Sequence, residues 1–413
     1  MSTATPEDEH RTDSPIDGVR HIPLSFDTAH AEDSALKLVQ AYAPEWSLNN
    51  AHVQFVPFTE GITNTLYKAT IELPGRSRAE IDQNAILLRA YGNGTEILID
   101  RQRELKAHTL LASRGLAPPL LARFENGLMY RFVSGDVCSP EDLRIPEVYR
   151  EVAARLGEWH GSLPISPIST YPTLNGRTPG QKSSQPAPTI PIPNIWTVTA
   201  SWIAALSSTT PADASRQSSL STELSYLRTR FEQTPGLFSR PYIFAHCDLL
   251  SGNVIRQQPL PDAEEKIRPV TFIDYEYATP APAAFDLANH FAEWGGFACE
   301  YTALPTRSAR KDFLHHYTLA FYDAVLEANS NVAVEIDFRA AVEQLEEQVN
   351  AMRGLPGFYW GVWALIQQGI SEIEFDYKSY AEKRLGEYWG WREAEREGKV
   401  EGSSVREKRW AEE

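Results

Sequence analysis

IFAHCDLLSGNVI occupies residues 243–255, and the apolar run VTFIDYEY follows it at residues 270–277. In the first stretch Asp248 precedes Asn253 by five positions, and in the second stretch Asp274 ends the apolar run. Phosphoryl transfer to an alcohol needs one carboxylate that orients the hydroxyl, and an amide and a second carboxylate that hold magnesium on the nucleotide phosphates. The spacing of these three residues predicts the catalytic loop and the metal-binding Asp of a kinase.

Each of the three residues also has a structural interpretation. Asp248 alone is compatible with a turn, Asn253 with a loop cap, and Asp274 with the polar end of a strand. The three together, in this order and spacing, favour catalysis.

Upstream of these motifs the pattern predicts a small sheet. Residues 52–56, 66–73 and 85–91 are rich in Val, Ile, Leu, Phe and Tyr, and Pro74-Gly75 marks a turn. These segments are expected to be strands of one antiparallel sheet.

A helix is predicted beside this sheet over residues 100–113. Asp100 is placed to cap its start, and Gly115 stands where a helix would stop. The apolar segment 128–133 ends in Ser-Gly-Asp at 134–136, a flexible polar stretch that suits a hinge. The boundary between two lobes is therefore placed there.

The second lobe should be mainly helical and should contain low-complexity sequence. Val148, Val152, Leu156 and Trp159 recur at helical spacing and predict an amphipathic helix. Pro, Ser and Thr near residues 164–222 predict surface loops or an insertion. The expected segments are a disordered leader at 1–20, a nucleotide-binding lobe at 21–133, and a catalytic and substrate lobe at 134–391. The last of these contains low-complexity stretches at 164–193 and 207–221. A charged tail at 392–413 is expected to be either a solvated helix or disordered.

The composition predicts an ordinary globular protein of the cytoplasm. With 413 residues, of which 42% are hydrophobic and 11% aromatic, the chain can form two packed lobes. Cys138, Cys247 and Cys299 lie far apart and predict neither a disulfide framework nor a zinc site. The sequence predicts no secretory leader and no membrane span. The net charge of -16 argues against a nucleic-acid partner, because such binders usually carry a basic stripe.

The catalytic motifs resemble those of the choline and ethanolamine kinase family, over about residues 55–388. The family's His-Asn-Asp-Leu-x-x-x-Asn run is present as HCDLLSGN at residues 246–253, with Cys247 in place of the usual Asn. DYEY at residues 274–277, followed by FDLANHF at residues 285–291, resembles a second motif of the family. The resemblance implies an α+β, protein-kinase-like fold of two lobes, with a small antiparallel-sheet N-lobe and a larger, mainly helical C-lobe.

By this resemblance the catalytic residues are Asp248, which orients the hydroxyl, and Asn253 and Asp274, which bind Mg2+. Asp286 is expected to brace the catalytic loop from a helix. The resemblance also implies that His246 braces the loop and is neither a ligand nor a base. Glu276 either supports the metal ligands or is a solvated strand end.

The phosphate-covering loop is predicted in the first lobe. Gly61, Thr63 and Asn64 belong to EGITN at residues 60–64, between two predicted strands. Small residues there let backbone N–H groups approach the phosphates of ATP closely. A tight hairpin turn is the alternative interpretation.

Arg89 ends a predicted strand, where the resemblance implies a guanidinium that grips nucleotide phosphates in two places. Glu104 on the following helix is expected to hold Arg89 in position. The alternative is a solvated helix surface formed by Arg101, Arg103 and Glu104.

The amino-alcohol pocket is predicted from FYWGVWALIQQGISEIEFDYKSYA, residues 358–381. The resemblance implies that Trp360 and Trp363 offer aromatic faces to an ammonium group and that Glu293 adds a carboxylate. A stripe of core tryptophans beside a surface Glu is the alternative. Ethanolamine has N–H donors that favour carboxylates, whereas the methyl groups of choline favour an aromatic cage.

The likeness of residues 91–96, 99–101 and 249–253 to ethanolamine kinases favours ethanolamine as the substrate. The resemblance therefore implies ATP-dependent phosphorylation of ethanolamine to phosphoethanolamine, the first step of phosphatidylethanolamine synthesis, with choline or both alcohols as the alternative.

Two rival interpretations of the function stay open. One is a phosphotransferase for a larger hydroxylated amine such as an aminoglycoside, and the other is an inert kinase-fold binding module. The oligomeric state also stays open, with a homodimer among the expectations.

Overall fold

The computed structural model divides the chain into two compact units. The first unit comprises Met1–Gly92 and Pro118–Val133, and the second comprises Asn93–Ala117 and Ser134–Glu413. The residues that the structure describes are 18–47, 52–58, 64–72, 75–170, 190–257, 269–328, 337–371, 373–398 and 404–413. The predicted leader up to residue 17, most of the phosphate-covering loop, and residues 171–189 of the low-complexity sequence lie outside them.

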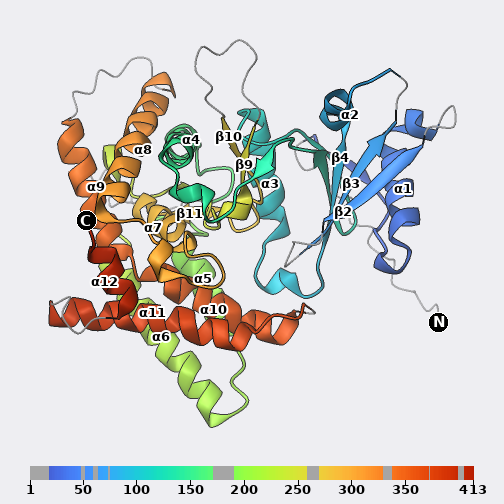
Figure 1. Ribbon diagram of the computed structural model, residues 1–413. Coiled ribbons are helices and arrows are strands. Elements are labelled where there is room, and N and C mark those ends of the chain that lie inside the picture. Colours follow the sequence, from blue (N-terminus) through green and yellow to red (C-terminus); the bar gives the residue numbers. More distant parts are fainter. Residues whose placement is uncertain are drawn as a thin grey trace, which may run out of the picture. The chain divides into compact units, whose positions relative to one another are not determined.

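The first unit is built on six strands. They are β1 (Arg20–Ile22), β2 (Val53–Phe58), β3 (Asn64–Ile71), β4 (Ile86–Tyr91), β5 (Leu120–Phe124) and β6 (Gly127–Arg131). They form one sheet in the order β1-β5-β6-β4-β3-β2 (Figure 1). Only β1 and β5 run parallel, whereas the other neighbours are antiparallel. The predicted antiparallel sheet is confirmed, with β1 and β5 as strands that the sequence pattern missed.

Helix α1 (Ala31–Tyr42) packs on this sheet through an apolar face. Leu38 and Val39 are buried in a core that includes Leu88 and Met129. This burial removes apolar side chains of both the helix and the sheet from water, and it stabilises the unit.

A second helix, α2 (Arg78–Asn84), lies between β3 and β4, where the sequence predicted only a turn. Ser77 accepts a hydrogen bond from the Glu80 backbone N–H at 3.3 Å, and the Glu80 carboxylate accepts one from the Ser77 backbone N–H at 2.8 Å. This reciprocal capping box satisfies two backbone donors at the start of the helix.

The second unit is mainly helical. Its helices are α3 (Arg101–Ser113), α4 (Pro146–Ser162), α5 (Ile195–Ala205), α6 (Pro211–Phe231), α7 (Ala283–Glu293), α8 (Arg307–Ala328), α9 (Phe338–Met352), α10 (Leu355–Ile370), α11 (Tyr377–Glu397) and α12 (Val405–Ala411). Its strands are β7 (Asp136–Val137), β8 (Ile243–Ala245), β9 (Val254–Arg256), β10 (Val270–Phe272) and β11 (Thr279–Ala281). They form a three-stranded sheet, β10-β9-β7, and the pair β11-β8. The predicted fold class, a small sheet region with a larger helical part, is confirmed.

Two predicted helices of this unit are confirmed, the first of them with its boundaries. Asp100 caps α3 by accepting hydrogen bonds from the backbone N–H groups of Gln102 and Arg103, both at 3.0 Å. Gly115 follows the helix with a φ of 70°, a left-handed conformation that glycine adopts without strain. The predicted amphipathic helix is α4, and its periodic apolar residues Val148, Val152, Leu156 and Trp159 are all buried.

The sequence interpretation of residues 207–221 as a surface loop is wrong, because α6 begins at Pro211. Thr210 caps the helix by accepting a hydrogen bond from the Asp213 backbone N–H at 3.1 Å. The buried residues of α6 recur every three or four positions, at Leu220, Leu224, Leu227 and Phe231. This spacing decides the local structure despite the high content of Ser and Thr.

The charged tail ends in a packed helix. Arg406, Glu407 and Trp410 of α12 are buried, and Arg353 binds Glu407 through an ion pair of 2.7 Å. The expectation of a solvated or disordered tail is therefore wrong for residues 404–413, because Trp410 anchors the helix and buried ion pairs satisfy its charges.

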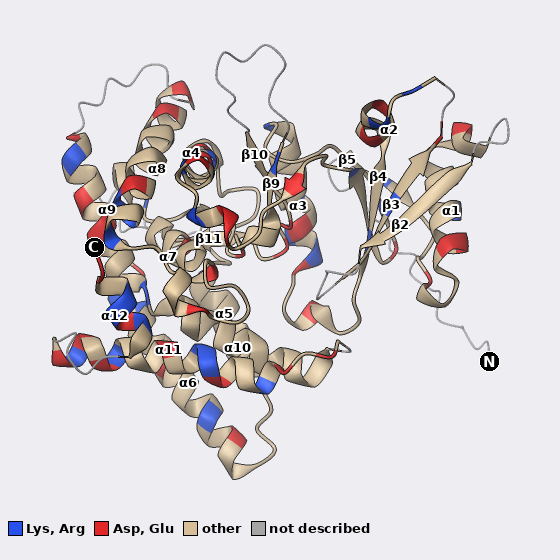
Figure 2. Cartoon of the chain, viewed as in Figure 1, with Lys and Arg blue, Asp and Glu red and all other residues tan. Residues whose placement is uncertain are grey.

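Several helices of the second unit carry charged side chains of both signs. Figure 2 shows Lys and Arg interspersed with Asp and Glu along α6, α9 and α11. Within the described ranges, no helix combines the length and the apolar content that crossing a bilayer requires.

Helices α4 and α8 pack closely at two glycines of α4. A Cβ atom on Gly157 would lie 2.3 Å from the backbone oxygen of Tyr317, and one on Gly161 would lie 2.7 Å from that of Phe321. The two helices therefore approach each other at a distance that only glycine permits.

We expect Gly157→Ala to lower the free energy of unfolding by roughly 2 to 3 kcal/mol, because its methyl group would push α8 away. Gly386→Ala in α11 is the matched control, since a Cβ there meets no atom within 4 Å. The control should be neutral or more stable by about 0.5 to 1 kcal/mol, from helix propensity. Urea denaturation measures both, and equal effects of the two substitutions would contradict the close packing.

Candidate active site

The predicted catalytic loop connects β8 to β9 in the second unit. Asp248 and Asn253 are both buried, and the Asn253 Nδ2 atom donates to the Asp248 backbone oxygen at 2.7 Å and to its Oδ2 at 3.2 Å. The structure thus brings together the carboxylate and the amide that the sequence placed five positions apart.

Asp274 is positioned beside this loop through the backbone of Ile273. The Ile273 N–H donates to the Asn253 backbone oxygen at 3.0 Å, and the Ile273 oxygen accepts from His246 Nε2 at 3.1 Å. The Asp248 N–H donates to His246 Nδ1 at 3.3 Å, which places the ring proton on Nε2. His246 therefore links the catalytic loop to the residue before Asp274, and the prediction that it braces the loop is confirmed.

Side chains of helix α7 bind the backbone of the catalytic loop. Asp286 accepts hydrogen bonds from the backbone N–H groups of His246 at 2.9 Å and Cys247 at 2.8 Å, and from His160 Nε2 at 3.0 Å. The prediction that Asp286 braces the loop is confirmed. One turn further along α7, Asn289 donates to the Cys247 backbone oxygen at 2.9 Å.

Cys247 departs from the family motif, and the structure shows how the loop accommodates it. Its side chain is fully buried, and its φ of 64° is a left-handed conformation in which Asn is far more common than Cys. The backbone bonds to Asp286 and Asn289 hold this conformation, and the Cys247 Sγ–H also donates to the Thr279 backbone oxygen at 3.9 Å.

Several carboxylates crowd the catalytic loop. Burial, and then the nearby charges of Asp274, Glu293 and Glu276, raise the pKa of the Asp248 carboxyl well above its usual value. Such a concentration of negative charge is an environment that a cation would stabilise.

Arg101 at the start of α3 supplies positive charge to Glu276. Its Nη1 atom lies 3.2 Å from Glu276 Oε2 and 2.9 Å from Glu104 Oε2, and its Nη2 atom donates to Thr95 Oγ1 at 2.6 Å. Glu276 and Glu104 are 2% and 3% exposed, so the alternatives of a solvated strand end and a solvated helix surface are wrong. The pairing of Glu104 with Arg89 stays a prediction.

The two tryptophans predicted for the ammonium pocket are anchored to the same framework. Trp360 donates from Nε1 to Asn289 Oδ1, and Trp363 donates from Nε1 to the Tyr277 hydroxyl, both at 2.8 Å. The centroids of the two indole rings lie 5.5 Å apart, and Tyr277 lies 5.7 Å from Trp360. The aromatic cluster is therefore tied to Asn289 and to the residues that follow Asp274.

Glu293 at the end of α7 is buried rather than on the surface. Its carboxylate pairs with Arg384 of α11 at 2.5 Å, and Arg384 also lies 3.4 Å from Glu387. Sequence reasoning missed Arg384. The assignment of Glu293 to the ammonium group stays a prediction, with Arg384 as a fixed partner that the substrate would share.

The residues predicted on the nucleotide side belong mostly to the first unit. Gly61 and Thr63 lie outside the described residues. Asn64 begins β3 opposite Tyr91, and Arg89 of β4 is 5% exposed. Their roles toward ATP stay predictions.

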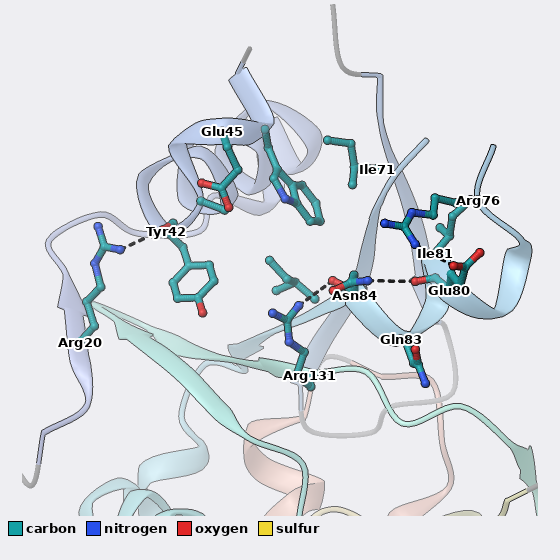
Figure 3. A pocket seen from close by; sticks show the side chains of 13 residues that line it. Arg20, Tyr42, Glu45, Ile71, Arg76, Glu80, Ile81, Gln83, Asn84 and Arg131 are labelled. Carbon is teal, nitrogen blue, oxygen red and sulfur yellow. Dashed lines mark hydrogen bonds and ion pairs between the residues drawn. The ribbon is translucent and has the colours of Figure 1, made fainter. Parts of the chain in front are cut away.

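A cavity of about 480 Å3 in the first unit is separate from these residues (Figure 3). Figure 3 shows Arg20 directed at Tyr42, the last residue of α1, and Arg131 directed at Asn84, the last residue of α2; the backbone oxygens of Tyr42 and Asn84 accept these hydrogen bonds at 2.8 and 2.6 Å. None of the described site residues lines this cavity.

Comparison with known proteins identifies the arrangement around the catalytic loop. Residues 55–389 match the family model of choline/ethanolamine kinases. The chain belongs to the choline/ethanolamine kinase family. It is 31% identical over 378 residues to ethanolamine kinase 2 of Homo sapiens, which covers 90% of this chain and 84% of the relative. It is 30% identical over 374 residues to a probable ethanolamine kinase of Nematostella vectensis, which covers 90% of this chain and 96% of the relative.

Solved structures of the family share the fold. An ethanolamine kinase of Plasmodium vivax aligns with a TM-score of 0.60 and 21% identity, over 86% of this chain and 88% of that chain. A choline kinase of Cryptosporidium parvum aligns with a TM-score of 0.60 and 19% identity, over 89% of this chain and 97% of that chain. The predicted family and fold are confirmed, and so is the prediction that the protein is a kinase that acts on an alcohol group.

Two functional neighbours that sequence reasoning did not use are Asn289 and His290. With Asp286 they stand at positions i, i+3 and i+4 of α7, so all three face the catalytic loop. His290 Nδ1 donates to the Leu249 backbone oxygen at 2.8 Å, and Nε2 accepts from Trp294 Nε1 at 3.2 Å. This helical spacing was the signal that could have revealed them.

Burial lowers the pKa of His290 from 6.5 to about 4. As the pH falls through 6.5, His290 takes up a proton in the unfolded chain, whereas in the folded protein it stays neutral until the pH approaches 4. Its contribution to the free energy of unfolding is therefore complete above pH 6.5 and is lost as the pH falls to 4. Relative to His290→Gln, which lacks the titrating ring, the wild type should lose about 3 kcal/mol of its free energy of unfolding between pH 7 and 4. Urea denaturation across this range checks the prediction, and a difference independent of pH would contradict it.

Proposed function

We propose that this kinase transfers the terminal phosphoryl group of ATP to the hydroxyl of ethanolamine and forms phosphoethanolamine, the first step of phosphatidylethanolamine synthesis. The observation that carries the proposal is that hydrogen bonds join Asn253 to Asp248 and to Ile273, the residue before Asp274. Asn289 links the same catalytic loop to Trp360. Ethanolamine kinases among the relatives support the choice of alcohol.

In the proposed reaction Asp248 orients the hydroxyl and accepts its proton. The Asn253 amide fixes the Asp248 carboxylate through the bond of 3.2 Å, so the carboxylate is placed before the alcohol arrives. The proposal assigns Asn253 Oδ1 and the Asp274 carboxylate to the metal ion as oxygen ligands.

These oxygens fit Mg2+. Magnesium is usually held by one or two carboxylates together with substrate phosphates, not by an all-protein cage. Accordingly, in the described part of the chain no cluster of three or more His, Cys, Asp or Glu side chains is arranged to hold a metal alone. When bound, the ion would supply positive charge to the phosphates and to the crowded carboxylates around Asp248.

On the nucleotide side, the proposal assigns Arg89 to the ATP phosphates and Glu104 to its support. Gly61, Thr63 and Asn64 would cover the phosphates with backbone N–H groups. The lobe boundary proposed at residues 133 and 134 separates this nucleotide-binding lobe from the catalytic lobe.

The ammonium group of the substrate is assigned to Trp360, Trp363 and Glu293. Ethanolamine presents N–H donors, and the carboxylates near Asp248 supply acceptors that choline could not use as hydrogen-bond partners. Choline is the second candidate, because the paired indole rings and Tyr277 form an aromatic surface that suits methyl groups.

The proposed location is the cytoplasm. All three cysteines are buried thiols outside any disulfide, which fits a reducing compartment. A homodimer is part of the proposal on the family resemblance alone, and light scattering of the purified protein tests it.

We expect the purified protein with ATP and Mg2+ to release ADP with ethanolamine at a higher kcat/KM than with choline, and not with an aminoglycoside. Asp248→Asn should lower kcat by about 100-fold or more, because the amide cannot accept the proton. Asp312→Asn is the control. Asp312 of α8 pairs with Arg150 of α4 at 2.7 Å and accepts a hydrogen bond from the Tyr149 hydroxyl at 2.8 Å, and neither partner belongs to the catalytic loop, so this variant should keep its activity.

Turnover of neither amino alcohol would exclude the proposed function. A higher kcat/KM for choline would establish the second candidate in its place. Unchanged activity of Asp248→Asn, in protein that keeps the wild-type melting temperature, would exclude the assigned role of Asp248.

A further inference from the structure

Asn289 connects the aromatic cluster to the catalytic loop with a single side chain. Its Oδ1 accepts the Trp360 indole N–H at 2.8 Å, and its Nδ2 donates to the Cys247 backbone oxygen at 2.9 Å. The side chain is fully buried. Because an indole N–H can only donate and a carbonyl can only accept, the two partners fix the orientation of the amide.

We propose that Asn289 is a positioning residue that sets the spacing between the ammonium-binding surface and Asp248, and thereby selects the length of the amino alcohol. This inference rests on the proposed function. Ethanolamine has two carbon atoms between nitrogen and oxygen, so the distance between its recognised ends is nearly fixed. A site that holds Trp360 and Asp248 at a fixed separation accepts this alcohol and rejects a longer one.

Asn289 acts on both ends of that separation. Cys247 directly precedes Asp248, so a hydrogen bond to the Cys247 oxygen fixes the peptide plane from which the Asp248 backbone begins. The bond to Trp360 fixes the rotation of the indole ring and hence the direction of its face. A movement of the Asn289 amide acts on both bonds, because both end on the same planar group.

The neighbouring residue His290 shows that this function is specific to Asn289. His290 binds the Leu249 oxygen on the other side of Asp248 at 2.8 Å, so α7 holds the backbone carbonyls on both sides of Asp248. The second ring nitrogen of His290 contacts Trp294, not the Trp360 cluster. His290 therefore steadies the loop, whereas Asn289 also relates it to the ammonium-binding surface.

The test compares kcat/KM for ethanolamine with that for 3-amino-1-propanol, which is one carbon longer. Asn289→Ala removes both bonds, and the ratio of the two values should fall by about tenfold or more, because a small displacement of Asp248 relative to Trp360 penalises the correctly sized substrate most. Asn289→Asp keeps the acceptor for Trp360 but turns a carboxylate oxygen toward the Cys247 oxygen. It should keep the KM for ethanolamine near that of the wild type and lower kcat.

Asn194→Ala is the matched control. Asn194 is also a buried Asn with two side-chain hydrogen bonds, to the Pro191 oxygen at 2.7 Å and from the Thr197 N–H at 3.0 Å, at the start of α5. It should lower the melting temperature without changing the substrate ratio. If Asn289→Ala lowers kcat/KM for both alcohols equally, Asn289 is only structural and the inference is overturned.

Trp360→Phe keeps the test decisive if neither Asn289 variant folds. It retains an aromatic ring but removes the indole N–H, so the substrate ratio should fall in the same direction, and an unchanged ratio overturns the inference. A wild-type protein that turns over neither ethanolamine nor choline would instead contradict the proposed function. Failure of the inference about Asn289 and failure of the proposed function are therefore distinguishable in the same assay.

Discussion

The buried carboxylate of Asp286 accepts hydrogen bonds from the backbone of His246 and Cys247 and from the ring of His160, and the catalytic loop takes its shape from these contacts. Burial disfavours the charged form of Asp286, yet the bond from His160 and the backbone donors hold its pKa below its usual value. The carboxylate therefore stays ionised, and it strengthens each bond that it accepts. Without it, two buried N–H groups and a buried imidazole would lose their partner.

These bonds also explain how the loop tolerates strain. Cys247 and Asp274 both have a φ of 64°, a conformation that costs a residue with a side chain about 1 to 2 kcal/mol. Hydrogen bonds to a charged group contribute about 1.5 to 3 kcal/mol each, so the three bonds to Asp286 outweigh the strain at Cys247. Strained residues of this kind cluster at functional sites because the surrounding structure fixes them there. Here Cys247 directly precedes Asp248, and Asp274 is itself a proposed metal ligand.

The same helix also connects the catalytic loop to the proposed ammonium-binding surface. Asp286, Asn289 and His290 share one face of α7, and each binds a backbone group of the catalytic loop. Through Asn289 and Trp360 the helix also reaches the aromatic cluster of α10. A rigid helix is a suitable carrier for such a site because its side chains keep fixed relative positions.

The sequence by itself determined the order and spacing of Asp248, Asn253 and Asp274, the strands β2 to β4, and the start and end of helix α3. These features depend on local chemistry, which a sequence displays directly. Low-complexity composition misled the interpretation of α6, since four buried apolar residues outweigh many exposed serines. Only the tertiary structure decided that Glu276 binds Arg101, that Glu293 binds Arg384 and that Trp410 packs the tail. The partners of these residues lie far away in the chain, and long-range pairing of buried charges leaves no periodic pattern in a single sequence.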